Sequence, residues 1–300
     1  MRFFGIILLL NISPVRTAVP LNYYDAHNHL QDEGLAPQLD QIAAQLAGLR
    51  LKSAVVNGKC EDDWAHVSEL SRRFAWVVPS FGVHPWDAGN RSPDWLSKLA
   101  AVLEAHPAAG VGEIGLDRWI IDRARPDDPR LAGLRRAPLD EQIEVLSAQL
   151  KLAARDNRPA TVHCLDAWGA LHHVLHETPV PARGYLLHAY SGPAEMVRGF
   201  VALGAYFSFN GSFLDERHAR HRETFKLVPR ERLLIETDAP AMSLPEPFCT
   251  YNLPPSATGQ SVNHPGNIEG AYAGLAALLG VTVAELATQT EANFLRFFRA

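Results

Sequence analysis

The sequence predicts an α/β fold consisting of a single (β/α)8 barrel of the TIM type. The chain has 300 residues, and one such barrel needs about 250. After residue 20, short runs rich in β-branched and other apolar residues alternate with longer amphipathic stretches. This alternation is typical of repeated βα units around a parallel sheet. We therefore expect a barrel domain over 21–300, preceded by an apolar N-terminal extension over 1–20.

Eight runs have the length and composition of barrel strands. They are Tyr23–His27, Ser53–Asn57, Trp76–Gly82, Gly110–Ile114, Ala160–His163, Tyr185–His188, Tyr206–Phe209 and Leu233–Thr237. The stretches between them repeat apolar residues every three or four positions, which predicts outer helices. These are Leu35–Leu49, Asp63–Phe74, Pro93–Ala105, Leu139–Ala154, Ala167–His176 and Ala194–Leu203.

Two further helices are expected at the end of the chain, over Ile268–Leu279 and Val283–Phe298. Thr282 and Glu285 have the spacing of a capping box at the start of the second. Residues 118–138 instead contain several Arg, Asp and Pro residues without a hydrophobic period, which predicts a long loop. At the rim of a barrel's active-site face, this loop would either shape substrate access or be a solvated insertion.

Composition limits the classes of partner. The net charge of −5 argues against a protein that grips nucleic acid through a broad basic face. It does not exclude a nuclease, because metal ions in a small site can supply the positive charge. Cys60, Cys164 and Cys249 are odd in number and far apart, so neither a disulfide framework nor a cysteine zinc site is indicated.

The N-terminus permits two interpretations. Arg2 followed by the apolar run Phe3–Leu10 is similar to the start of a secretory signal. Arg16, however, lies three residues before a cut after Ala18, where a small residue is required. The run is also too short to span a bilayer. We expect a cytoplasmic protein without a stable membrane partner, with export as the alternative, and the sequence leaves the oligomeric state open.

A set of histidines and carboxylates points to a metal centre. His27 and His29 are two residues apart on a predicted strand, so both side chains face the same side, and Asp25 is placed to orient a ligand. Four further potential ligands end or directly follow later predicted strands, where barrel enzymes place catalytic groups: Glu113, His163, His188 and Asp238. Each alone could be a buried histidine or a capping carboxylate, but together they indicate metal binding.

The mixture of imidazoles and carboxylates suits Zn2+, Mn2+ or related divalent ions better than Ca2+, and six ligands are too many for one tetrahedral site. Two ions sharing Glu113 is the simplest arrangement. A water between them would ionise near neutral pH and become a nucleophile.

The chain resembles the TatD-related deoxyribonucleases, a branch of the metal-dependent hydrolase superfamily. The resemblance is carried, in order, by DAHNHL (25–30), GVHP (82–85), GEIGLD (112–117), VHC (162–164), HAYSG (188–192) and ETDAP (236–240). Asn263 with Pro265, and then Asn293 to Phe297, resemble the family's closing segments.

The resemblance implies two metal sites that share a bridging carboxylate. One metal would be held by His27, His29, Glu113 and Asp238, and the second by Glu113, His163 and His188. It also implies that His84 contacts a substrate phosphate, the alternative being a structural histidine at a strand end.

The sequence departs from the family pattern around the expected pocket. Trp86 stands where a histidine is frequent, Leu165 where a basic residue is common, and 118–138 is longer than usual. Trp86 and Trp119 could stack a base or pack a lid. Asp117 could orient a ligand or water, and Asp166 is expected to cap the helix that starts near Ala167.

These residues and the resemblance predict hydrolysis of phosphodiester bonds, with DNA ends as substrate, two Mg2+, Mn2+ or Zn2+ ions as cofactors, and Glu113 and Asp238 as catalytic residues. Asp238 would accept the proton of the attacking water. The first alternative is a related amidohydrolase-superfamily enzyme acting on a small phosphoester, lactone or amide. Many such relatives have a carboxylated lysine where this chain has Glu113, which favours the nuclease. The second alternative is a metal-binding protein without catalysis.

Overall fold

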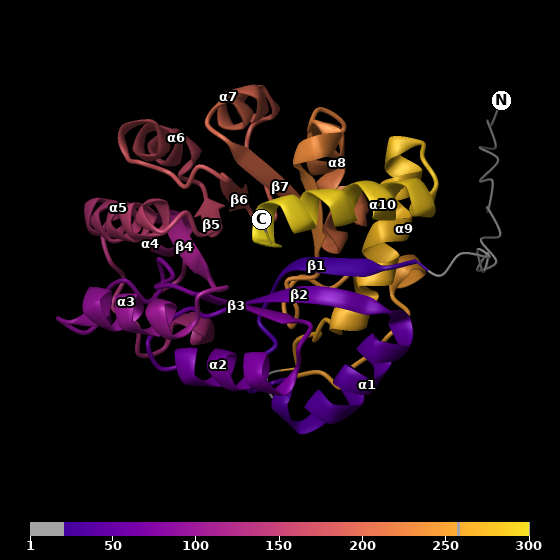
Figure 1. Ribbon diagram of the computed structural model, residues 1–300, viewed down its shortest axis with the longest axis horizontal. Helices are drawn as coiled ribbons and strands as arrows, with labels where there is room; N and C mark the ends of the chain where they lie inside the picture. The colour runs from indigo at the N-terminus through magenta and orange to yellow at the C-terminus, as the bar shows by residue number, and fades with distance from the viewer. Residues whose placement is uncertain (1–20, 257–258, 300) are drawn as a thin grey trace.

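In the computed structural model, residues 21–256 and 259–299 are described and form a barrel of eight parallel strands surrounded by helices (Figure 1). Each strand pairs with the next in chain order. The strands are β1 (Tyr23–Asn28), β2 (Leu51–Asn57), β3 (Val77–Phe81), β4 (Gly110–Asp117), β5 (Ala160–Leu165), β6 (Tyr185–Leu187), β7 (Ala205–Asn210) and β8 (Leu233–Glu236). The predicted barrel is confirmed, whereas the extension over 1–20 lies outside the described residues.

The helices cover the outside of the strands. They are α1 (Leu39–Leu49), α2 (Trp64–Arg73), α3 (Trp95–Ala105), α4 (Trp119–Asp122), α5 (Leu139–Arg155), α6 (Trp168–Glu177), α7 (Val197–Ala202), α8 (Ala219–Phe225), α9 (Ile268–Leu279) and α10 (Val283–Phe294). Within the described ranges, no single helix is long and apolar enough to cross a bilayer; only 265–279 and 283–299 taken together pass that test, and they are bent by 108°.

Two local predictions have different outcomes. Thr282 and Glu285 form the predicted capping box, with both reciprocal hydrogen bonds present. Helix α8 was not predicted, because its seven residues bury only Thr224 and Phe225 and so show no helical period. The predicted loop at 118–138 contains one short helix, α4, and a 3-10 turn at Pro129–Leu131.

One end of the barrel is closed by aromatic side chains. Phe294, Phe297 and Phe298, at the end of α10 and just after it, pack against buried strand residues that include Tyr24 and Tyr206. In Figure 1, α10 lies across the middle of the ring of strands. Most of these strand residues lie near the amino ends of their strands. Ligands therefore have access from the carboxyl ends, as in other barrels of this kind.

The ring closes between the first and last strands through the residues that carry the expected ligands. The Asp238 amide donates to the His27 carbonyl at 2.9 Å, and the His29 amide donates to the Ala239 carbonyl at 2.8 Å. Asp25 strengthens this junction, since its carboxylate accepts from the amide and the hydroxyl of Thr237 at 3.0 and 2.6 Å.

His264, before α9, is buried as a neutral ring. Its Nδ1 accepts from the Gly266 amide at 2.8 Å, and its Nε2 lies 2.9 Å from Gln45 Oε1. This pattern requires the proton on Nε2. A second proton on Nδ1 would oppose the Gly266 amide. Burial lowers the pKa of His264 to about 4.

Candidate metal centre

The six candidate ligands meet at the carboxyl end of the barrel. His27 and His29 come from β1 and the residue after it, Glu113 from β4, and His163 from β5. His188 directly follows β6, and Asp238 follows β8 by two residues. Five of the six are buried, and the His163 side chain is 17% exposed. Side chains far apart in the sequence therefore share one largely water-excluded site.

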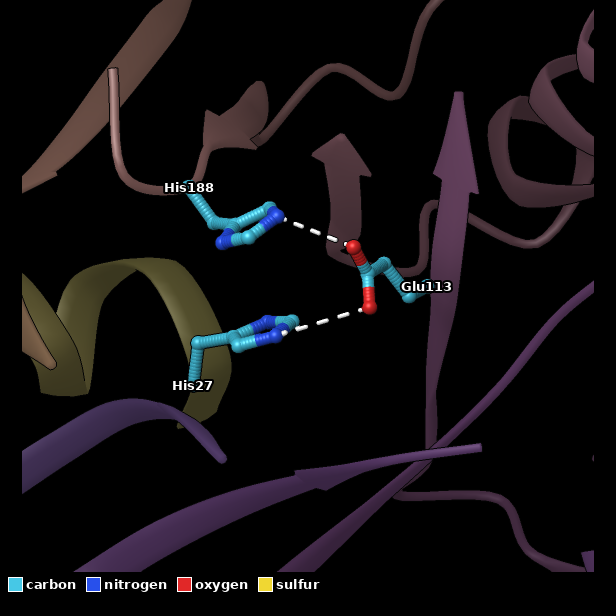
Figure 2. Close-up of side chains that lie close together, drawn as sticks. All are labelled: His27, Glu113 and His188. Carbon is cyan, nitrogen blue, oxygen red and sulfur yellow. Dashed lines mark ion pairs between the residues drawn. The ribbon is translucent and has the colours of Figure 1, made fainter. Parts of the chain in front are cut away.

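Glu113 lies between two groups of histidines. Its Oε2 is 3.1 Å from His29 Nε2 and 3.6 Å from His27 Nε2. Its Oε1 is 2.9 Å from His188 Nε2 and 3.1 Å from His163 Nδ1. Figure 2 shows the carboxylate with one oxygen directed at His188 and the other at His27. Each carboxylate oxygen thus faces a different pair of imidazoles.

Asp238 joins only the first pair. Its Oδ1 is 3.3 Å from His27 Nε2 and 3.6 Å from His29 Nε2. With Glu113 Oε2, these atoms define one group of possible ligands, and Glu113 Oε1 with His163 and His188 defines the other.

An irregularity in β4 sets the direction of Glu113. The sequence predicts that this strand ends at Ile114, but it continues to Asp117, and its pairing with β5 shifts between Val111 and Ile114. Such irregularities re-aim side chains. Gly112 makes this path possible, because a Cβ there would lie 2.8 Å from both Ser80 Oγ and Thr161 Cβ. Glu113 and Asp117 are four residues apart on this strand, so their side chains both face the site.

Oxygen atoms lie behind three of the imidazoles, on the side away from the centre of the site, and two of them are within hydrogen-bond distance. His29 Nδ1 lies 2.8 Å from the Asn57 carbonyl, and His163 Nε2 lies 3.1 Å from Asp117 Oδ2. His188 Nδ1 lies 3.5 Å from Glu236 Oε1. A protonated outer nitrogen leaves the inner nitrogen with a lone pair directed at the centre, as metal-binding histidines require.

Sequence reasoning did not select Glu236, and it noted Asp117 only as a possible orienting group. Glu236 belongs to the ETDAP motif and is buried, where it binds Ser208 and Asn210. The signal in the sequence that could have identified Glu236 is its position as a second carboxylate, two residues before Asp238. Only the fold shows that it faces His188.

The electrostatics favour ionised carboxylates. Burial opposes the charge on Glu113, but the surrounding histidines hold its pKa well below the usual range. Asp238 is similar, because burial raises its pKa while the contact with His27 and the nearby imidazoles lower it to a net value below normal. Burial also disfavours the charged form of His163, yet Asp117 and Glu113 raise the pKa of His163 to about 9. The carboxylates therefore attract cationic partners to this site.

The donor set fits divalent metal ions. His27 Nε2 and His29 Nε2 are 3.2 Å apart, and His163 Nδ1 and His188 Nε2 are 3.3 Å apart. Two nitrogen ligands on one tetrahedral Zn2+ are separated by about 3.3 Å, given its usual bond lengths. Within residues 21–256 and 259–299, possible ligand atoms lie within 4.8 Å of one another in three sets: His27–Glu113–His188, His27–His29–Asp238 and His84–Glu113–His163.

His84 lies at the edge of this cluster, with Nε2 3.4 Å from Glu113 Oε1. Its Nδ1 accepts from the Trp86 amide at 3.1 Å. Burial lowers the pKa of His84 to about 4, although Glu113 acts in the opposite direction. A neutral ring that accepts at Nδ1 carries its proton on Nε2, so His84 presents a hydrogen-bond donor to the centre.

Two carboxylates do not act as the sequence suggests. Asp25 accepts hydrogen bonds from the backbone amides of His27 and Thr237. It therefore fixes the position of the backbone that carries the ligands, and it does not orient an imidazole ring. Burial raises the pKa of Asp25 to about 7 despite its hydrogen bonds. The predicted helix cap at Asp166 is wrong: the residue before α6 is Ala167, and Asp166 adopts φ 55° and faces Arg123.

A cavity of about 800 Å³ opens above the candidate ligands. Its wall includes apolar side chains such as Trp86, Leu134 and Leu165. The polar side chains around it that sequence reasoning did not select include Lys59, Arg130, His218 and His221, together with Asp32, Asp87 and Ser191. The cavity is large enough for a nucleotide-sized ligand.

Comparisons with known proteins agree with this geometry. The family model described as TatD related DNase matches residues 24–299. The chain is 27% identical over 277 residues to YabD of Bacillus subtilis, a metal-dependent hydrolase, covering 92% of this chain and 98% of the relative. It is 28% identical over 279 residues to the 3'-5' ssDNA/RNA exonuclease TatD of Escherichia coli K12, covering 92% and 98%.

Solved structures show the same architecture. The crystal structure of YjjV, a TatD homologue from Escherichia coli K12, matches with a TM-score of 0.78 at 26% identity and covers 94% of this chain and all of that one. A TatD-family hydrolase from Entamoeba histolytica also gives a TM-score of 0.78, with 94% and 100% coverage, but at 18% identity it supports the fold alone. With its barrel, its clustered histidines and carboxylates and a family match over nearly its whole length, the chain belongs to the TatD-related DNase family of metal-dependent hydrolases.

Proposed function

We propose that this protein hydrolyses phosphodiester bonds in nucleic acid, acting on single-stranded ends with the help of two divalent ions. The observation that carries the proposal is the position of Glu113, whose two oxygens face separate pairs of histidines. The similarity to a relative named as a 3'-5' ssDNA/RNA exonuclease supports nucleic acid as the substrate class.

In this proposal, His27, His29, Asp238 and Glu113 would hold one ion, and Glu113, His163 and His188 would hold the other. When bound, such ions polarise phosphate oxygens and lower the pKa of a water nucleophile. Outer partners at His29, His163 and His188 would hold the single proton of each neutral ring on the outer nitrogen, so that the inner nitrogen could face an ion.

His84 contributes a hydrogen bond and not a metal ligand. Its Nδ1 is occupied by the Trp86 amide, so the proton on Nε2 points to the region of Glu113 Oε1. A phosphate oxygen beside Glu113 would accept a hydrogen bond from this N–H group. Because burial keeps His84 neutral near pH 7, the contact adds no further positive charge.

Asp238 is proposed to accept the proton of the attacking water. Its low pKa keeps it ionised at neutral pH, although ligation reduces its basicity. Replacing Asp238 by Asn and measuring metal content and turnover separately tests the role. An unchanged rate at full metal occupancy would exclude Asp238 as the base.

The main experiment incubates end-labelled single-stranded DNA with the protein and Mg2+, Mn2+ or Zn2+. Metal-dependent shortening of the strand is expected, and the Glu113→Gln variant should lose both activity and bound metal. Parallel reactions with a small phosphodiester, a lactone and an amide examine the alternative substrates. Turnover of these compounds without DNA cleavage would reject the nuclease proposal, and no turnover by the metal-loaded protein on any of them would reject hydrolysis.

A further inference from the structure

The segment 118–138 is built as a fixed wall beside the cavity. Its apolar residues Ile120, Ala124 and Leu131 form a small cluster of their own, packed against Trp86 and Trp119. Polar contacts attach it to the loop after β3: the Arg135 amide donates to Asn90 Oδ1 at 2.7 Å, and Asn90 Nδ2 donates to the Gly133 carbonyl at 3.1 Å. These contacts fix the backbone of the segment, and so they fix the position from which its side chains reach the cavity.

The side chain that it places at the cavity is Arg130, which lines the same space as Glu113 and His163. The guanidinium carbon lies 4.7 Å from the centroid of Trp119 and 5.8 Å from that of Trp86. These two rings stack on each other with centroids 5.9 Å apart. An arginine held over aromatic faces loses little further freedom when it binds a ligand.

One edge of the Arg130 guanidinium has a partner and the other does not. Nε and Nη2 donate to the carboxylate of Asp128 at 2.9 and 2.6 Å. Among the residues that the structure describes, no hydrogen-bond partner is found for Nη1. The side chain is 48% exposed, so the edge formed by Nη1 and the second hydrogen of Nη2 can bind a ligand.

The wall is also tied to the metal centre. Trp86 Nε1 donates to Asp117 Oδ2 at 2.6 Å, and the same oxygen lies 3.1 Å from His163 Nε2. The ring that supports Arg130 and the proposed ligand His163 therefore share one buried carboxylate. This connection fixes the Trp86 ring, which lies next to the Arg130 guanidinium, relative to His163.

We infer that Arg130 binds a second phosphate of the substrate, adjacent to the one being hydrolysed. The inference rests on the proposed function and makes Arg130 a substrate-positioning residue. A planar guanidinium edge with two parallel N–H donors matches two oxygens of a phosphate. The site therefore prefers a strand, or a nucleotide with a further phosphate, over a compound with a single phosphodiester.

The experiment pairs a protein change with a substrate change. Arg130→Ala and Arg130→Lys are compared with the parent on two short single strands: one with ordinary phosphates, and one with uncharged methylphosphonates on both sides of the cleaved linkage. Arg125→Ala is the matched control, because Arg125 is in the same segment, is 77% exposed, also faces an aspartate and does not line the cavity.

For the ordinary strand, Arg130→Ala should raise KM about tenfold or more, the usual worth of a hydrogen bond between charged groups. For the methylphosphonate strand, KM should change less than about twofold, since the partner is already missing. Arg130→Lys should restore only part of the loss, because a lysine lacks the paired donors. Arg125→Ala should leave both values unchanged.

Equal losses on the two strands, or no loss on either, would overturn the inference. Binding of both strands is also measured by fluorescence anisotropy in the Asp238→Asn background, where no cleavage is needed. If strand binding depends on Arg130 but the parent protein does not hydrolyse the strand, the proposed function is wrong and the inference about Arg130 stands. Hydrolysis by the parent without any dependence on Arg130 would sink this inference alone.

Discussion

Replacing Asp117 by Asn should lower the affinity of the site for metal ions, although Asp117 is not itself a proposed ligand. Asp117 is fully buried, and its oxygens face three donors: Trp86 Nε1 at 2.6 Å, the Ile120 amide at 3.0 Å and His163 Nε2 at 3.1 Å. Asparagine offers one oxygen and one NH2 group. At least one of the three donors would then face another donor, so either His163 or Trp86 loses its orientation or the start of α4 loosens.

The expected size follows from these contacts. Loss of an orienting partner behind a ligand typically costs about 10- to 100-fold in metal affinity, or about 1.4 to 2.7 kcal/mol. A buried donor without a partner costs about 1–3 kcal/mol of folding free energy. Calorimetric titration with Mn2+ or Zn2+ should show weakening of one of two binding events, and urea unfolding should show the lower stability.

Asp166→Asn is the matched control for this prediction. Asp166 is a carboxylate beyond the end of β5, but it is 36% exposed and faces Arg123 on the surface. Its metal titration should equal that of the parent. If Asp117→Asn, folded and soluble, binds both ions as tightly as the parent, the role assigned to Asp117 in orienting His163 is wrong.

Three further predictions concern stability. The pKa of His264 is about 4 in the folded chain and about 6.5 in the unfolded chain. The neutral ring therefore makes its full contribution to the free energy of unfolding above pH 6.5. This contribution, up to about 3 kcal/mol, is lost as the pH falls toward 4. His264→Asn, which can still accept from the Gly266 amide, should flatten the pH dependence of the urea midpoint over this window, and an unchanged slope would contradict the assignment. Phe294→Ala should lower the free energy of unfolding by about 3–5 kcal/mol, because it opens a cavity between Tyr24 and Phe298. A thermal unfolding midpoint equal to that of the parent would argue that the aromatic side chains at this end of the barrel do not stabilise the fold. Thr282→Ala removes the side-chain half of the capping box and should cost about 1 kcal/mol, whereas a neutral result would mean that α10 is held by packing alone.

Much of the architecture could be predicted from the sequence, because buried parallel strands and amphipathic helices leave strong periodic signals. The convergence of the candidate ligands could also be expected, since carboxyl ends of barrel strands meet on one face. Asp25 shows the limit of this reasoning. Its spacing from His27 suggested contact with a ring, but the carboxylate binds backbone groups across the junction with β8.

Features that depend on a local path or a distant partner could not be predicted. The pairing of β4 with β5 shifts between Val111 and Ile114, and β4 continues to Asp117; no periodic pattern marks either feature. Asp166 has a residue type suited to capping, but its left-handed backbone at φ 55° removes it from that position. The place of Arg130 depends on Trp86, in the loop after β3, and Trp119, at the start of α4, which meet only in the folded chain.

The junction between the first and last strands has a mechanical consequence. The Asp238 amide donates to the His27 carbonyl there, and the two side chains would also share an ion. A cation bound by both side chains would then link β1 to the residues that follow β8, where the barrel closes. Removal of that ion with a chelator should speed amide hydrogen exchange at His29 and Asp238 before it does so at β5 or β6, which would show that metal binding stabilises the closure of the barrel.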